Sequence, residues 1–166
     1  MSNIVVMGVA GCGKSSLGQA LAGTCGWPYI EGDAHHSPAS IAKMRAGMAL
    51  TDADRSGWLA RLGELLREAP QGAVLACSAL KLAYRAQLRQ ASPGLRFVFL
   101  DIGRELSLQR VAARADQHLF PASLVDSQFA TLESPVGEAG VLRVDAALSP
   151  AEQLSQVLAW LQGERT

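Results

Sequence analysis

Residues 8 to 15 read Gly-Val-Ala-Gly-Cys-Gly-Lys-Ser and match the pattern G-x-x-x-x-G-K-[ST]. Glycines at this spacing let backbone N–H groups curl around a polyphosphate, while the lysine reaches the β- and γ-phosphates and the serine hydroxyl binds Mg²⁺. A helix that starts at the loop directs the positive end of its dipole at the same anion. The motif therefore predicts a nucleoside triphosphate site with these contacts: Gly8, Val9, Ala10, Gly11, Cys12, Gly13, Lys14, Ser15 and Ser16.

Two carboxylates stand at the end of the second apolar run, in Glu31-Gly32-Asp33. Side chains two residues apart on extended backbone face the same way. We expect Asp33 to orient an acceptor hydroxyl and take its proton, a role that contributes about 10²–10⁴ in rate. Glu31 is expected to reach Mg²⁺ beside Ser15, and Lys14 to act on the transferred phosphate. A solvated turn is the alternative interpretation of the acid pair.

Short apolar runs alternate with helical patterns along the chain. The runs that we predict as strands are residues 4–7, 28–30, 73–77, 97–100 and 141–144. Helices are predicted at residues 14–23, 59–66, 80–90 and 106–111, and from 149 onward, where Ser149-Pro150-Ala151-Glu152 is a capping-box sequence. Apolar strands separated by helices predict a three-layer α/β fold, with a five-stranded parallel sheet and helices on both faces.

Ligands of such sheets bind at the carboxyl ends of the strands, which gathers the phosphate loop, the acid pair and residues 77–81 on one edge. Residues 116–140 contain no clear strand and are long enough for a mobile cover, so we expect a lid at about residues 110–135. Arg110 and Arg114 share one helical face leading into it. We expect Arg114, together with Arg110, to close over the ATP phosphates, where an arginine contributes about 10³–10⁵ in rate. An exposed basic helix face is the alternative.

The bulk properties narrow the class of protein. With 166 residues and 49% hydrophobic content, the chain is expected to form one domain, residues 1–166. The formal net charge of +0 argues against nucleic acid and anionic membranes as partners. The phosphate loop begins at Gly8, so a cleaved N-terminal signal would destroy it, and we expect a cytoplasmic protein.

Three further groups of residues carry a family resemblance. The first is Glu31-Gly32-Asp33 with His36, Lys43-Met44, Asp54-Arg55 and Trp58-Leu59; the second is Cys77-Ser78-Ala79-Leu80-Lys81 with Tyr84-Arg85; the third is Arg110, Arg114, His118, Ser127-Gln128-Phe129 and Leu132-Glu133-Ser134-Pro135. Together they resemble the gluconokinases over nearly the whole chain, from Gly8 to about Asp145. The chain departs from that family's usual residues at Ser40, Ala49 and Ser56-Gly57, all on the substrate side.

The resemblance implies the small P-loop kinase fold shared with shikimate and nucleoside monophosphate kinases. It implies transfer of the γ-phosphoryl group of ATP, with Mg²⁺, to the 6-hydroxyl of D-gluconate, and it favours a homodimer. For a sugar acid of this kind, a bidentate arginine suits the carboxylate, so we expect Arg55 and Arg85 to bind it. His36 is expected to donate to a substrate hydroxyl, and Lys81 to contact substrate or phosphate. Each of these residues has a structural alternative on the protein surface or in its core.

Two other functions remain open from the sequence. One is a kinase of another small metabolite, such as a shikimate-kinase-like enzyme, which would carry a glycine-rich triplet after the third strand where this chain has residues 78–81. The other is a nucleotide-binding sensor without turnover. The presence of Lys14, Ser15 and Asp33 favours an enzyme.

Overall fold

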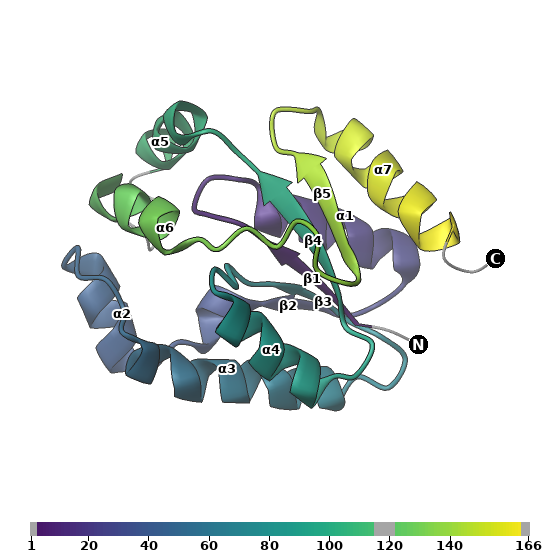
Figure 1. The fold of residues 1–166 in the computed structure, drawn as a ribbon, viewed down its shortest axis with the longest axis horizontal. Coiled ribbons are helices and arrows are strands. Elements are labelled where there is room, and N and C mark those ends of the chain that lie inside the picture. Colours follow the sequence, from purple (N-terminus) through teal and green to yellow (C-terminus); the bar gives the residue numbers. More distant parts are fainter. Residues whose placement is uncertain (1–2, 115–121, 164–166) are drawn as a thin grey trace.

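The computed structural model describes residues 3–114 and 122–163. Five strands form one sheet in which all neighbouring strands run parallel, in the order β2-β3-β1-β4-β5 (Figure 1). The strands are β1 (Ile4–Met7), β2 (Tyr29–Glu31), β3 (Val74–Ala76), β4 (Arg96–Asp101) and β5 (Val141–Asp145). The predicted five-stranded parallel sheet is confirmed, and the five apolar runs mark its strands.

Helices cover both faces of this sheet. In the described part of the chain they are α1 (Lys14–Cys25), α2 (Pro38–Arg45), α3 (Asp52–Arg67), α4 (Leu82–Ala91), α5 (Arg104–Ala113), α6 (Val125–Thr131) and α7 (Pro150–Gly163), with 3₁₀ turns at Gly32–His35 and Ala122–Leu124. α1 and α7 pack on one face, and α3 and α4 on the other. The predicted three-layer α/β arrangement is therefore confirmed.

The burial of the central strand explains why the strand sequences are apolar throughout. β1 lies between β3 and β4, and its side chains from Ile4 to Met7 are fully buried. A strand with helices over both faces has no solvent side, so apolar residues do not alternate with polar ones. The phosphate loop begins directly at the end of this buried strand.

Helix caps fix where the site helices begin. The predicted capping box of α7 is present: Glu152 N–H donates to Ser149 Oγ at 3.2 Å, and Ser149 N–H donates to Glu152 Oε2 at 3.1 Å. A second box, which the sequence analysis did not identify, joins Thr51 and Asp54 at the start of α3 with N···O distances of 3.1 and 2.9 Å. It fixes the first turn of the helix that carries Arg55.

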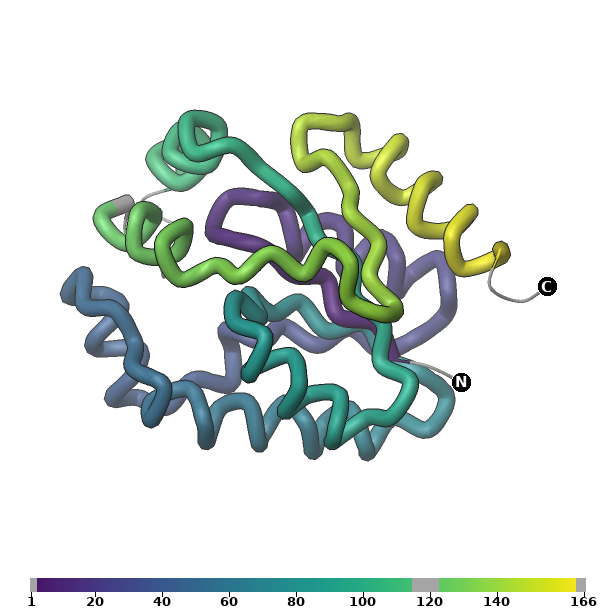
Figure 2. The backbone as a smooth tube through the Cα atoms, in the orientation of Figure 1, coloured from purple at the N-terminus to yellow at the C-terminus, as the bar shows by residue number. Residues whose placement is uncertain are grey.

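The segment expected to form a lid is only partly described. Residues 115–121, with His118, lie outside the described residues, whereas α5 and α6 flank them. Figure 2 shows α5 and α6 beside one another, at the end of the sheet where the phosphate loop emerges. Within the described ranges, the structure contains no helix with the length and apolar character needed to cross a bilayer.

Candidate active site

The phosphate loop occupies the turn between β1 and α1. Gly8 has φ 146°, and a Cβ there would lie 2.7 Å from the Leu100 carbonyl oxygen, so the loop needs glycine to pass β4. Gly13, with φ 96°, leads into α1 in a left-handed conformation. Lys14 Nζ donates to the Val9 carbonyl at 3.3 Å. The motif thus forms the strand–loop–helix unit that phosphate binding requires, and the individual contacts with nucleotide stay predictions.

Two side chains from α5 and α6 form hydrogen bonds with the phosphate loop at Ala10. Its carbonyl accepts a hydrogen bond from Ser107 Oγ of α5 at 2.8 Å. Its N–H donates to Gln128 Oε1 of α6 at 2.6 Å. Both side chains are buried, so the backbone N–H and carbonyl of Ala10 are both satisfied by residues far away in the sequence.

Arg110 also forms hydrogen bonds with the phosphate loop. Its Nη1 donates to the Gly11 and Cys12 carbonyls at 3.2 and 3.4 Å, and its Nη2 donates to the Ala146 carbonyl at 3.0 Å. The guanidinium therefore joins the phosphate loop to the turn after β5. Arg114 is exposed at the C-terminal end of α5. That either arginine contacts the ATP phosphates stays a prediction.

The predicted metal ligands lie together at the start of α1. Ser15 Oγ donates to Glu31 Oε2 at 2.6 Å, and the Tyr29 hydroxyl donates to the same oxygen at 2.5 Å. Burial of the ring, followed by the hydrogen bond to Glu31, raises the pKa of the Tyr29 hydroxyl, so the phenol stays a donor. Hydroxyl and carboxylate oxygens are ligands that Mg²⁺ prefers, and one or two protein groups suffice beside nucleotide phosphates. These residues therefore fit the ion.

A cleft opens beside the phosphate loop and contains five of the predicted residues: Ala10, Lys14, Asp33, His36 and Arg55. The space between these residues, counted together with the open solvent at its mouth, is about 710 Å³. Asp33, the second carboxylate of the acid pair, and Lys14 of the phosphate loop therefore line the same cleft. The other lining residues were not predicted as contacts: Met44, Ala49, Leu50, Ser78, Leu80, Leu124, Ser127, Gln128 and Thr131.

His36 is held in the cleft by an aromatic stack. Its ring lies on the Trp58 indole with centroids 4.2 Å apart and 18° between the planes. Trp58 donates from Nε1 to the Gly32 carbonyl at 2.8 Å, which ties α3 to the acid pair. His36 Nε2 lies 3.6 Å from Asp33 Oδ1, while its buried Nδ1 has no hydrogen-bond partner among the described residues. The imidazole thus stands beside the candidate base, with one buried nitrogen that no described residue satisfies.

Arg55 brings a buried positive charge to the same cleft. Its side chain comes from the first turn of α3, and the residue is only 9% exposed. Its Nε is buried without a hydrogen-bond partner in the described part of the chain. A buried cation with an unused donor is costly unless an anion or acceptor meets it. Arg55 therefore fits an anionic ligand such as a carboxylate.

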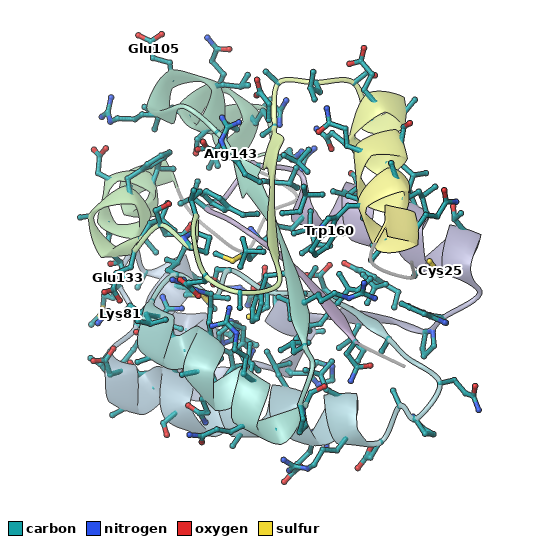
Figure 3. The ribbon with its side chains drawn as sticks, turned by 45° about the vertical axis from the view of Figure 1, so that its right-hand side comes forward. Cys25, Lys81, Glu105, Glu133, Arg143 and Trp160 are labelled. Atoms are coloured by element: carbon teal, nitrogen blue, oxygen red, sulfur yellow. The ribbon has the colours of Figure 1, made fainter. Side chains whose placement is uncertain are left out.

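Lys81 lies outside the cleft wall, in a network with Asp52. Lys81 Nζ is 2.9 Å from Asp52 Oδ1, and the Tyr84 hydroxyl donates to the same oxygen at 2.5 Å. The hydrogen bond from Tyr84, and then that from Lys81, lowers the pKa of Asp52. Figure 3 shows Lys81 next to Glu133 near the start of α4. A contact of Lys81 with substrate or phosphate stays a prediction.

The structure places Arg85, which was predicted to bind the substrate carboxylate, away from the cleft. The residue is fully buried and does not line the cleft. Its Nη1 donates to the Ala79 and Leu80 carbonyls at 2.8 and 3.1 Å. Its Nε and Nη2 donate to Glu138 at 3.1 and 2.6 Å, and Nη2 also donates to the Glu133 carbonyl at 3.0 Å. All five guanidinium N–H groups are thereby used within the protein.

The role of Arg85 is to shape the loop after β3. Ala79 has φ 47°, a left-handed conformation that is uncommon for a residue with a side chain. Its neighbours Ser78 and Leu80 line the cleft, so the bonds from Arg85 hold a strained part of the wall in place. Burial alone would raise the pKa of Glu138, but its ion pairs with Arg85 and Arg89 lower it overall.

Comparisons with known proteins agree with this architecture. A family model described as shikimate kinase matches residues 10–162. A gluconokinase of Gluconobacter oxydans is 44% identical over 164 residues, which cover 97% of this chain and 92% of that protein. The crystal structure of a gluconokinase from Sinorhizobium meliloti is 48% identical, with a TM-score of 0.87, over 95% of this chain and 90% of that one. A sugar kinase from a Janibacter species, 37% identical, has a TM-score of 0.91 and coverage of 98% and 95%.

Proposed function

Because the chain belongs to the shikimate kinase family of the matching model and, within it, to the gluconokinases, we propose that it phosphorylates D-gluconate at the 6-hydroxyl with ATP. The observation that carries the proposal is the composition of the cleft. A phosphate-binding lysine, a carboxylate and a buried cation with an unused donor, namely Lys14, Asp33 and Arg55, line one cavity. These are the groups that a phosphoryl acceptor with a carboxylate needs.

In this proposal the two ends of gluconate meet different elements. Arg55 binds the carboxylate, and its guanidinium fork suits two oxygens better than an ammonium would. The 6-hydroxyl lies at Asp33, which takes its proton as the bond to phosphorus forms. His36 Nδ1, buried without a partner among the described residues, accepts or donates one hydrogen bond to an intermediate hydroxyl.

The nucleotide side uses the phosphate loop. Backbone N–H groups of the loop and Lys14 bind the β- and γ-phosphates, and Arg114 neutralises charge on the transferred group. Ser15 and Glu31 would hold Mg²⁺, which would offset the negative charge of the phosphates when bound. The Tyr29 hydroxyl, by donating to Glu31, orients that carboxylate toward Ser15.

The acceptor is tested by measuring ADP release from MgATP with D-gluconate, shikimate or AMP, each against a reaction without acceptor. We expect release to depend on gluconate, with a product that ³¹P NMR identifies as a 6-phosphate ester. A higher kcat/KM with shikimate would instead favour a shikimate-kinase-like enzyme. Nucleotide binding without acceptor-dependent release would favour the sensor, and either result would contradict the proposal.

The proposal also covers the location of the protein in the cell and its oligomeric state. Because the reaction consumes ATP, we place it in the cytoplasm, where ATP is available. We also propose a homodimer, which the resemblance to gluconokinases favours, and sedimentation equilibrium at micromolar concentration tests it: a species at the 17.5 kDa mass of one chain would contradict it.

A further inference from the structure

The backbone N–H and carbonyl of Ala10 join the phosphate loop to two helices that flank the cleft. Gln128 of α6 accepts its N–H at 2.6 Å, and Ser107 of α5 donates to its carbonyl at 2.8 Å. A buried backbone N–H without an acceptor is costly, and the described loop supplies none for this one. The position of α6 is therefore tied to the shape of the loop.

The same helix forms a wall of the acceptor cleft. Gln128 lines the cleft, together with Ser127 and Thr131 of α6 and Leu124 just before it. Ala10 lines it too. One side chain therefore contacts the loop that binds nucleotide and faces the space where an acceptor binds.

Apolar packing also joins Ala10 of the phosphate loop to the α6 wall of the cleft. Ala10 belongs to a small apolar cluster with Val111 of α5, Leu124 and Val125, and with Met44 of α2. This cluster is separate from the two that pack against the faces of the sheet. Ala10 thus links the loop to α6 and its neighbours, while Val9 and Cys12 of the same loop pack in the cluster on the sheet.

We propose that Gln128 is a positioning residue that couples the two substrates: nucleotide binding at the phosphate loop orders the α6 wall of the cleft, and acceptor binding there strengthens nucleotide binding. Coupling of this kind must be reciprocal, because each ligand changes the affinity for the other by the same factor. The acceptor half rests on the proposed function. The nucleotide half does not, since it needs only binding at the phosphate loop.

The first test follows hydrogen exchange of backbone amides on adding the non-hydrolysable analogue AMP-PNP with Mg²⁺, in the absence of any acceptor. In the wild type we expect exchange to slow at residues 8–16 and also at residues 122–132. In Gln128→Met, which keeps the side-chain length but removes the acceptor oxygen, we expect slowing at residues 8–16 alone. Gln109→Met, at an exposed position of α5, is the matched control and should behave as the wild type.

A rescue variant separates coupling from simple loss of packing. Gln128→Glu keeps an oxygen that accepts the Ala10 N–H, so nucleotide should again slow exchange at residues 122–132. Its added negative charge should weaken AMP-PNP binding, because it lies beside the phosphate site. If Gln128→Met does not fold, the wild type and Gln128→Glu still test the proposal. Nucleotide that does not slow hydrogen exchange at residues 122–132 in either protein would overturn it.

The second test measures the dissociation constant of MgAMP-PNP by calorimetry with and without saturating D-gluconate. We expect gluconate to tighten binding about fivefold or more in the wild type, the lower end of typical coupling, and to have no effect in Gln128→Met. An equal ratio in both proteins would overturn the proposal. If the wild type releases no ADP from MgATP in the presence of gluconate, the proposed function fails, and the exchange experiment still decides whether nucleotide orders α6.

Discussion

The guanidinium carbon of Arg55 lies 5.5 Å from the centre of the Tyr84 ring. This contact seats the cation on an aromatic face, where the attraction needs none of its N–H donors. The Tyr84 hydroxyl is in turn fixed by Asp52, at the N-terminal end of α3 that also carries Arg55. The arginine is thus positioned before any ligand arrives, and its donors stay available to a carboxylate.

Replacing Arg55 with methionine should weaken gluconate binding with little effect on ATP. Hydrogen bonds to a charged group contribute about 1.5–3 kcal/mol, so the KM for gluconate should rise about 10- to 150-fold. Steady-state kinetics with each substrate varied separately measures both constants. Arg61→Met, at an exposed position of the same helix, is the control. An unchanged gluconate KM in Arg55→Met would show that the carboxylate binds elsewhere.

Replacing Asp33 with asparagine should remove the base and leave binding nearly intact. We expect kcat to fall about 10²- to 10⁴-fold, while AMP-PNP affinity changes less than threefold. Single-turnover measurements isolate the chemical step from product release. Asp101→Asn, which lies at the end of β4 and pairs with Arg143, serves as a control for the loss of a carboxylate. A normal single-turnover rate in Asp33→Asn would assign the proton transfer to another group.

Replacing Tyr29 with phenylalanine should loosen the Mg²⁺ site without changing its ligands. The variant loses the hydrogen bond that orients Glu31, and loss of such a supporting contact typically costs 10- to 100-fold in metal affinity. Calorimetric titration of ADP with and without Mg²⁺ gives the contribution of the metal directly. We expect that contribution to shrink while metal-free ADP binds as before. Equal metal dependence in both proteins would place Mg²⁺ away from Glu31.

Replacing Arg85 with methionine should destabilise the fold rather than raise the gluconate KM selectively. Breaking a buried ion pair costs about 3–5 kcal/mol, because the remaining groups lose their partner. Urea unfolding measures the loss. The double variant Arg85→Met/Glu138→Gln should recover part of it, since the carboxylate left behind is then neutral. A fully stable Arg85→Met with a raised gluconate KM would restore Arg85 to the binding site.

The ion pair at the start of α3 should give stability that depends on acid pH. The hydrogen bond from Lys43, followed by that from the Thr51 N–H, lowers the pKa of Asp54 from 3.8 to about 2. Because the folded-state pKa is the lower one, ionised Asp54 stabilises the protein above about pH 4, and this contribution is lost as the pH falls toward 2. The wild type should melt higher than Asp54→Asn at pH 7, with a difference that shrinks between pH 4 and 2.

Lys43→Met should show the same pH pattern, because it removes the partner of the same ion pair. Thermal melts by circular dichroism across this pH range compare the three proteins. A melting difference between wild type and Asp54→Asn that stays constant from pH 7 to pH 2.5 would contradict the assignment.

The sheet and the capping box of α7 were predictable because their causes are local. Each strand is an apolar run between turn signals, and Ser149-Pro150-Ala151-Glu152 carries the start of α7 within four residues. The start of α2 was missed, although Ser37-Pro38 is the same serine–proline signal and Ser37 does accept from the Ser40 N–H. The helix is short and has few apolar residues, so periodicity did not reveal it.

The roles of Arg85 and Gln128 were not predictable from the sequence. The acceptors of Arg85 come from the loop after β3 and from residues 133–138, and Gln128 meets a residue 118 positions away. An arginine or glutamine on a helix gives no local sign of whether its partner is solvent, substrate or a distant carbonyl. Both assignments needed the tertiary structure, whereas the phosphate loop and Asp33 were predicted from residue type and spacing, and Arg55 from the resemblance to gluconokinases.

The phosphate loop follows directly from β1, and this position determines how the loop responds to heating. β1 is the middle strand of the sheet, and its four side chains are fully buried. Amides in such a buried central strand are expected to exchange through opening of the whole domain rather than through local opening. The base of the phosphate loop should therefore lose its structure only when the sheet itself unfolds cooperatively.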